Sequence, residues 1–150
     1  MNKLYIDFED VKKGIDELKL DYKVDTIICL TRGGLVPAGV LAYKLDCKDI
    51  INLKVQSYID QERHEIDLEP LHYGDIIKIQ ESKNILIVDD VYDSGETMKA
   101  VYSYLGGIAG ESTVNLNSFC VIQKQDNDVL NHVLFEGDLN TWVVFPWDFE

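Results

Sequence analysis

Residues 84–101 read NILIVDDVYDSGETMKAV and join a strand-like run to a helix-like run through a short turn. The apolar run at 85–88 ends in two adjacent carboxylates, Asp89 and Asp90, and a third acid follows at Asp93. A short apolar run of this kind is typical of a central, buried strand. Three acids at the end of such a strand, just before a helix, indicate a functional site rather than a surface.

The same alternation of strands and helices extends in both directions from this stretch. The expected strands cover 26–30, 50–58, 75–79, 85–88, 114–122 and 132–135, and the expected helices cover 7–20, 35–45 and 95–105, the last ended by the glycine pair at 106–107. The polar segment 59–74 predicts a mobile loop, for which hairpin character stays open, and the aromatic tail 141–150 predicts irregular structure. The pattern indicates an α/β fold with a mostly parallel, doubly wound sheet, in which ligands bind at the carboxyl ends of strands.

Composition narrows the classes of function. The 150 residues predict a single domain over 1–150, and no apolar run reaches the roughly 18 residues of a membrane span. A net charge of −13 argues against a nucleic-acid partner, which needs a basic surface. Three scattered cysteines, Cys29, Cys47 and Cys120, are typical of buried thiols in a reducing compartment, so we expect a cytoplasmic protein.

The strand-end acids suit oxygen-rich, uncharged or cationic partners. Adjacent strand residues point to opposite faces, so Asp89 and Asp90 can address different groups. A carboxylate pair accepts hydrogen bonds from vicinal hydroxyls or holds Mg²⁺ through oxygen. The acidic chain as a whole repels a polyphosphate, so binding one requires a divalent cation and local N–H donors.

The turn after the acids supplies such donors. Gly95 allows close backbone approach, the start of the helix presents N–H groups and a favourable dipole to a phosphate, and Thr97 adds a hydroxyl. Alternatively, Asp93 or Ser94 simply caps the helix. Capping accounts for one such residue, but it does not account for the acid pair at the strand end.

Other families with strand-end acids fit less well. A Walker B strand requires a GxxxxGK[ST] loop, and the chain has none. A phospho-receiver carries its acid pair after the first strand, whereas most of the sheet precedes this one. The GxGxxG fingerprint of dinucleotide-binding folds is also absent.

The segment ILIVDDVYDSGET resembles the phosphoribosyl-pyrophosphate (PRPP) signature of the type I phosphoribosyltransferases. Three further segments resemble parts of the bacterial xanthine-guanine phosphoribosyltransferases: TRGGLVPAGVLAYKL the pyrophosphate loop and its helix, QSYIDQER the start of the flexible loop, and TWVVFPWD the purine-covering segment. The resemblance implies the type I fold, with a mobile loop at about 59–74 and a small C-terminal hood at about 136–150.

For the PRPP half of the site, the resemblance implies ribose hydroxyls on Asp89 and Asp90, with Asp90 also next to Mg²⁺. It implies that the loop 93–97 cradles the 5-phosphate and that Asp93 also faces the purine N7 as acid and base. The loop residues are Asp93, Ser94, Gly95, Glu96 and Thr97. Glu96 stands at a variable position where relatives often carry Gly or Lys, and a carboxylate is unfavourable beside a phosphate unless it points to solvent.

For the leaving group, the resemblance implies that Arg32 and Gly33 bind pyrophosphate. Relatives carry a cis peptide just before this arginine position, here Thr31–Arg32. Arg63 would close over the pyrophosphate, although its spacing from Tyr58 is one residue shorter than in relatives. A solvated loop charge therefore stays open as the alternative for Arg63, and an ordinary surface arginine as that for Arg32.

For the base, the resemblance implies four residues near the hood. Lys124 would donate to the 6-oxo group of a purine, Trp142 would stack on the ring, and the backbone of Val143 would read its 2-position edge. Asp148 would support the hood. The alternatives are a surface lysine and aromatic residues that only close a core.

Together these features predict Mg²⁺-dependent transfer of the phosphoribosyl group from PRPP to a 6-oxopurine (guanine, xanthine or hypoxanthine) in purine salvage, with a nucleotide and pyrophosphate as products. A non-catalytic PRPP- or nucleotide-binding regulator on the same fold stays open, as does transfer to a pyrimidine or another base. We expect neither a nucleic-acid nor a membrane partner. The resemblance also implies a homo-oligomer, either a dimer or a tetramer.

Overall fold

The computed structural model describes residues 1–59, 62 and 64–149. Its strands are β1 (Asn2–Tyr5), β2 (Thr26–Thr31), β3 (Ile50–Ile59), β4 (His64–Leu68), β5 (Asn84–Tyr92), β6 (Asn115–Gln123), β7 (His132–Glu136) and β8 (Thr141–Val144). Its helices are α1 (Phe8–Asp16), α2 (Leu35–Lys44), α3 (Tyr73–Glu81) and α4 (Glu96–Ala109). No helix in the described part of the chain is long and apolar enough to cross a bilayer.

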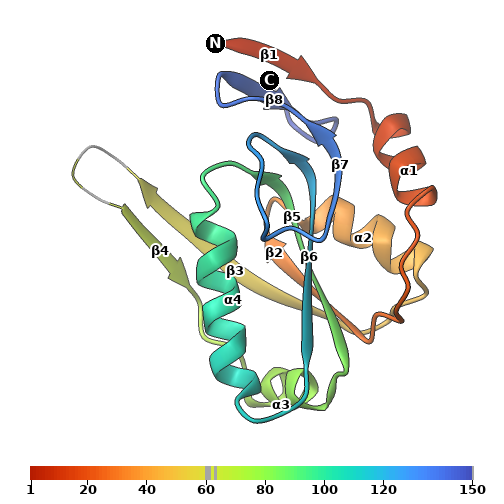
Figure 1. Ribbon diagram of the computed structural model, residues 1–150, viewed down its shortest axis with the longest axis vertical. Coiled ribbons are helices and arrows are strands. Elements are labelled where there is room, and N and C mark those ends of the chain that lie inside the picture. Colours follow the sequence, from red (N-terminus) through yellow and green to blue (C-terminus); the bar gives the residue numbers. More distant parts are fainter. Residues whose placement is uncertain (60–61, 63, 150) are drawn as a thin grey trace.

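The strands form one large sheet and one small sheet (Figure 1). The large sheet has the order β4-β3-β2-β5-β6-β7 and is parallel except where β4 returns antiparallel to β3. The predicted doubly wound α/β fold is therefore confirmed. Because the parallel strands all end at the same edge, the segments that follow β2, β5 and β6 meet there.

Helices cover both faces of the large sheet, which explains the apolar character of its central strands. Leu86 and Val88 of β5 belong to the core under α1 and α2, whereas Ile85 and Ile87 belong to the core under α3 and α4. All four side chains are fully buried. A strand covered on both faces needs apolar residues at every position, which is the pattern that predicted it.

Two secondary-structure predictions are wrong, one in the type of an element and one in where a helix ends. The segment 75–79 is part of the helix α3, not a strand, because this connection runs from the hairpin to the parallel strand β5 and buries Ile79 against the core. A five-residue segment with three isoleucines fits either structure. The second error is the end of α4, which runs through the glycines at 106–107 to Ala109 because Leu105 and Ala109 continue its buried face. Gly110 follows as the C-cap, with φ +58°.

Other boundaries differ more modestly. The first helix ends at Asp16 rather than at residue 20. The segment expected as a loop at 59–74 contains β4 and the start of α3, and β4 pairs with β3 in a long hairpin. The hairpin character that the sequence left open is thus present. Cys29, Cys47 and Cys120 are free and buried, as predicted.

The hood is built from both ends of the chain. The tail is not irregular throughout: β8 forms a parallel pair with β1, from Asn2 opposite Thr141 to Tyr5 opposite Val144. Figure 1 shows this two-stranded sheet beside the carboxyl edge of the large sheet, with the two termini close together. The four residues of β1 are exposed and carry no periodic pattern that would predict a strand. From here, the hood means β1, β8 and residues 145–149.

Candidate active site

Two cavities open at the carboxyl edge of the large sheet. The first, here the phosphate-loop cavity, has a volume of about 570 Å³ and extends from Arg32 and Gly33 past Asp89 and Asp90 to the turn before α4. The second, the hood cavity, has about 1040 Å³ and continues from the same arginine and glycine to the tail of the hood. Asp90 lines both cavities, so the two form one continuous site around it.

The loop after β2 packs tightly on the end of β5. The Thr31–Arg32 peptide is cis, as the resemblance implied. A Cβ atom at Gly33 would lie 2.6 Å from Oδ1 of Asp90, and one at Gly34 would clash with the carbonyl oxygen of Val88. The two glycines thus let this loop, here the pyrophosphate loop (residues 31–34), lie directly against the acids.

The acid pair is held by its own backbone. Oδ1 of Asp89 accepts a hydrogen bond from the Asp90 N–H (2.9 Å), and Oδ1 of Asp90 accepts one from the Val91 N–H (2.7 Å). Burial raises the pKa of Asp89 well above its usual range, and the charge of Asp90 raises it further. Burial also raises the pKa of Asp90, although its hydrogen bonds with Asp89 and with the Val91 N–H oppose that shift. Hydroxyl donors or a cation bound at this pair would therefore offset the desolvation free energy of the two carboxylates.

The acid pair suits Mg²⁺ shared with a substrate. The described residues contain no cluster of three or more metal-ligating side chains. Mg²⁺ commonly takes one or two carboxylates from the protein and completes its octahedron with water and phosphate oxygens. Asp90, which lines both cavities, and Asp89 beside it fit that donor set.

The turn before α4 is shaped by a glycine. Gly95 has φ +86° and occupies the N-cap position, and a Cβ atom there would clash with the hydroxyl of Tyr92. Ser94 Oγ accepts only a long hydrogen bond (3.4 Å) from the Glu96 N–H, and the N-cap has no side-chain hydrogen bond. Simple helix capping therefore does not account for this turn.

The side chains of the turn divide between cavity and surroundings. Asp93, Ser94, Gly95 and Thr97 line the phosphate-loop cavity. Glu96 begins α4, is half-buried and is absent from the described residues that line either cavity. Its carboxylate is thus kept away from the cavity that its neighbours surround.

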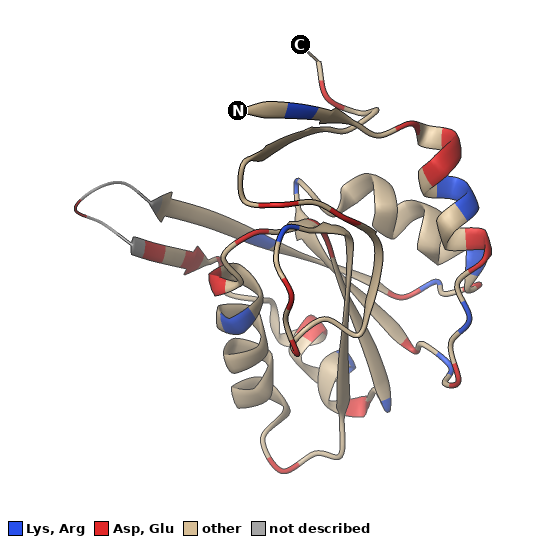
Figure 2. Ribbon diagram, turned by 45° about the horizontal axis from the view of Figure 1, so that its top comes forward, with Lys and Arg blue, Asp and Glu red and all other residues tan. Residues whose placement is uncertain are grey.

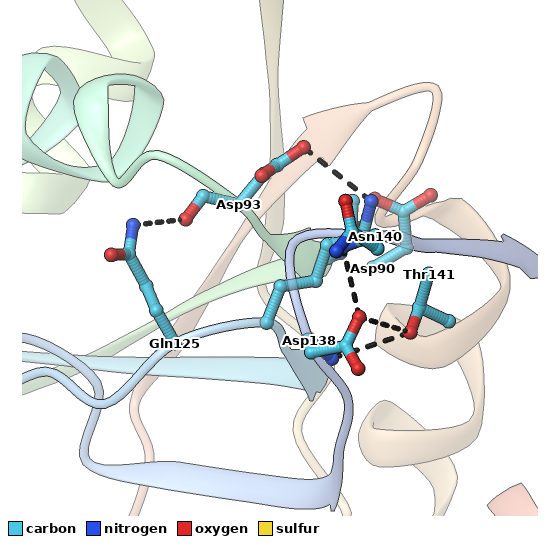
Figure 3. Close-up of polar contacts among 8 residues, drawn as sticks. Asp90, Asp93, Gln125, Asp138, Asn140 and Thr141 are labelled. Carbon is cyan, nitrogen blue, oxygen red and sulfur yellow. Dashed lines mark hydrogen bonds and ion pairs between the residues drawn. The ribbon is translucent and has the colours of Figure 1, made fainter. Parts of the chain in front are cut away.

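Lys124 and Asp93, which sequence analysis placed near the base, form an ion pair at the ends of the adjacent strands β6 and β5. Lys124 follows β6, and its Nζ lies 3.5 Å from Oδ2 of Asp93. The lysine side chain is only 10% exposed, against 59% for the aspartate, so it is not an ordinary surface lysine. Gln125 donates from Nε2 to the Asp93 carbonyl oxygen at 2.6 Å (Figure 3). Sequence analysis missed Gln125, whose only signal is its place beside Lys124.

The residues assigned to the hood have different environments. Trp142 is 57% exposed on β8, and Val143 is buried. Trp147 instead stacks on Phe145, with ring centroids 4.9 Å apart and planes at 6°. Oδ2 of Asp148 accepts a hydrogen bond from the Phe145 N–H (2.8 Å), which braces the tail. Trp147 therefore packs on Phe145 and also lines the hood cavity, whereas Trp142 is exposed but is absent from the described lining of both cavities.

The turn that leads into β8 is also braced. Oδ1 of Asp138 accepts hydrogen bonds from the Asn140 N–H (2.8 Å) and from the Thr141 hydroxyl (3.0 Å), as Figure 3 shows. This turn sets where β8 begins.

Arg63, predicted to contact pyrophosphate, lies outside the described residues.

Comparison with known proteins agrees with this geometry. A family model described as the phosphoribosyl transferase domain matches residues 3–150. The xanthine-guanine phosphoribosyltransferase of Gluconobacter oxydans is 33% identical over 127 residues, which cover 81% of this chain and 67% of the relative. That of Roseobacter denitrificans is 31% identical over 128 residues, with the same coverage. The crystal structure of a purine phosphoribosyltransferase from Pyrococcus horikoshii superposes with a TM-score of 0.81 at 27% identity, covering 100% of this chain and 97% of that one.

Proposed function

This chain belongs to the phosphoribosyl transferase family, and we propose that it transfers the phosphoribosyl group of PRPP to a 6-oxopurine in purine salvage. The products are a purine nucleotide and pyrophosphate. The observation that carries the proposal is the pairing of Lys124 with Asp93 at the sheet edge, beside the cavity that Arg32 and the acid pair line. The named relatives, which are xanthine-guanine and purine phosphoribosyltransferases, support the same substrate class.

The PRPP half of the reaction follows from the two glycine-dependent loops. Backbone N–H groups of the turn at 93–97, the dipole of α4 and Thr97 hold the 5-phosphate. Asp89 and Asp90 accept hydrogen bonds from the ribose hydroxyls, and Asp90 contributes an oxygen to Mg²⁺. Mg²⁺, when bound with PRPP, offsets the negative charge of the pyrophosphate group. Arg32 and the backbone of Gly33 bind that group as it leaves.

The base half uses the Asp93–Lys124 pair. The ammonium of Lys124 donates to the 6-oxo oxygen, which an adenine 6-amino group would not offer as an acceptor. Asp93 takes the proton from N7 while N9, the other nitrogen of the five-membered ring, attacks C1 of PRPP and displaces pyrophosphate. Trp142 stacks on the purine, the backbone of Val143 meets its 2-position edge, and Asp148 braces the tail that holds both.

The test is a panel of bases with PRPP and Mg²⁺, with nucleotide followed by chromatography. We expect product with at least one of guanine, xanthine and hypoxanthine, none with adenine, and no turnover after chelation of the metal. Absence of product with all three 6-oxopurines would contradict the substrate class. Calorimetry that detects PRPP binding without turnover would instead favour a non-catalytic regulator on the same fold.

We also propose that the chain forms a dimer or tetramer, as the family resemblance implies. The helix α2, which follows the pyrophosphate loop directly, leaves Leu35 48% exposed and Tyr43 93% exposed. Large apolar side chains that stay exposed on a helix are typical of a contact with another chain. Light scattering coupled to size-exclusion chromatography gives the mass, and a monomer at micromolar concentration would contradict the proposal.

A further inference from the structure

The site carries more negative charge than Arg32 alone can balance when a pyrophosphate group binds. Four carboxylates, those of Asp89, Asp90, Asp93 and Asp148, line the two cavities. A pyrophosphate group that binds among them needs positive charge from the protein in addition to its metal. Among the described residues that line either cavity, only Arg32 and Lys54 are cationic.

Lys54 stands beside the pyrophosphate loop because of strand register. It lies on β3 directly opposite Thr31, the last residue of β2, and Arg32 follows at the cis peptide. Thr31 further ties the two strands through its hydroxyl, which donates to the Leu53 carbonyl oxygen at 3.5 Å. The position of Lys54 relative to the loop is therefore fixed by the sheet rather than by a flexible segment.

The direction of the Lys54 side chain also fits. Side chains alternate along a strand, and on β3 Val55 and Ser57 line the phosphate-loop cavity. Val55 lines the hood cavity as well, but of the two cavities Lys54 and Gln56 line only the hood cavity, together with Arg32 and Asp90. Lys54 also lines a smaller cavity of about 220 Å³ that contains Glu69. Asp75 lines this smaller cavity too, but the acid that pairs with the Lys54 ammonium is Glu69.

The present partner of Lys54 is a weak one. Its Nζ lies 3.8 Å from Oε2 of Glu69, with both side chains more than half exposed. Glu69 is held next to it because its N–H donates to the Lys54 carbonyl oxygen at 3.0 Å, just beyond the end of β4. Figure 2 shows that the strand before it, β4, is itself acidic. An exposed pair at this distance contributes little and is easily exchanged for a stronger anion.

We propose that Lys54 is a second cationic ligand for the pyrophosphate group of PRPP, and that Glu69 holds its ammonium until pyrophosphate displaces the carboxylate. This inference rests on the proposed function, because it names a further ligand for the same leaving group. Lys54 contacts the departing pyrophosphate through a charge-assisted hydrogen bond, and Glu69 competes for that contact.

The test uses two substitutions with opposite expected signs. Calorimetry with pyrophosphate and Mg²⁺ should show a Kd about tenfold higher for Lys54→Met, because one charge-assisted hydrogen bond is lost. The Kd should fall by about twofold for Glu69→Gln, because the competing carboxylate is neutralised. Lys54→Arg should retain most of the affinity. In turnover assays, Lys54→Met should raise KM for PRPP and leave KM for the purine unchanged.

A matched pair elsewhere on the surface provides the control. Lys78 and Asp49 form an exposed ion pair (2.9 Å) remote from the site, so Lys78→Met and Asp49→Asn should leave pyrophosphate binding unchanged. Circular dichroism and thermal unfolding check that Lys54→Met is folded. Wild-type affinity in a folded Lys54→Met protein, or weaker binding in Glu69→Gln, would overturn the inference.

Its failure is separable from failure of the proposed function. If no base is converted to a nucleotide but pyrophosphate binding still depends on Lys54 and Glu69, the substrate class is wrong and the ligand assignment holds. If 6-oxopurines are converted and Lys54→Met turns over with unchanged KM for PRPP, the function holds and the ligand assignment is wrong.

Discussion

The segment from β5 to α4 and the hood contribute to the same site but are built in opposite ways. From Asp89 to Thr97 the acids, the glycine turn and the helix start follow one another within a few residues. The hood instead pairs the first strand of the chain with the last, so β8 depends on a partner strand from the other end of the chain as well as on its own local turn. A site made of consecutive residues keeps its geometry when distant parts of the chain change. A surface made of two chain ends is lost when either end is changed.

The largest effect on turnover should come from Asp93, the acid of the β5–α4 segment that lies next to the base. Asp93→Asn keeps the shape of the side chain but removes the base proposed at N7, so kcat should fall by about 10²- to 10⁴-fold. The Kd for PRPP, measured by calorimetry, should change little. Asp126→Asn, on an exposed loop residue, is the control. A kcat that equals that of the wild type would remove Asp93 from the chemistry.

Close packing of the pyrophosphate loop can be broken by one methyl group. Gly34→Ala places a Cβ atom against the carbonyl oxygens of Val88 and Leu30, so the free energy of unfolding should fall by about 1–3 kcal/mol and pyrophosphate binding should weaken. Gly39→Ala, in the same helix region, meets nothing within 4 Å among the described residues. The control should be neutral or stabilising, by up to about 1 kcal/mol. Equal unfolding curves for the two variants would contradict the packing argument.

The hood can be opened without touching the PRPP half. Deleting residues 2–5 removes the partner of β8, and we expect KM for the purine to rise by about three- to tenfold while the Kd for PRPP stays unchanged. Trp142→Ala should raise the same KM to a similar or smaller extent, through the loss of one aromatic stacking contact. Loss of PRPP affinity in either variant would show that the two regions are not separable.

The smallest effect concerns a long-range contact that supports the edge strand β7. Tyr22 and Nε2 of His132 are joined by a hydrogen bond of 2.7 Å, and burial lowers the pKa of His132 below 6.5. The unfolded chain therefore binds this proton more readily, so the free energy of unfolding should decline as pH falls below about 6.5 and through the lower folded pKa. Urea unfolding at pH 7.5 and 5 should show a smaller decline for His132→Gln than for the wild type. The exposed His72→Asn should behave as the wild type.

The errors of sequence analysis follow the same division between local and distant structure. The buried strands β2, β5 and β6 were predicted because each contains a run of buried apolar residues. The short segment 75–79 was assigned wrongly, since its three isoleucines fit a strand or a helix until the crossover into β5 decides. The glycines at 106–107 do not end α4, because burial of Leu105 and Ala109 outweighs the low helix propensity of the glycines.

The sequence by itself determined the α/β class, the family and the order of acids, turn and helix after β5, because those features depend on neighbouring residues and on burial of whole strands. Only the tertiary structure decided that β1 completes the hood, that Gln125 holds the Asp93 backbone and that Lys54 stands opposite Thr31 with Glu69 beside it. These contacts arise from strand register and from residues far apart in the chain. Exposed side chains leave no periodic pattern from which such pairings could be read.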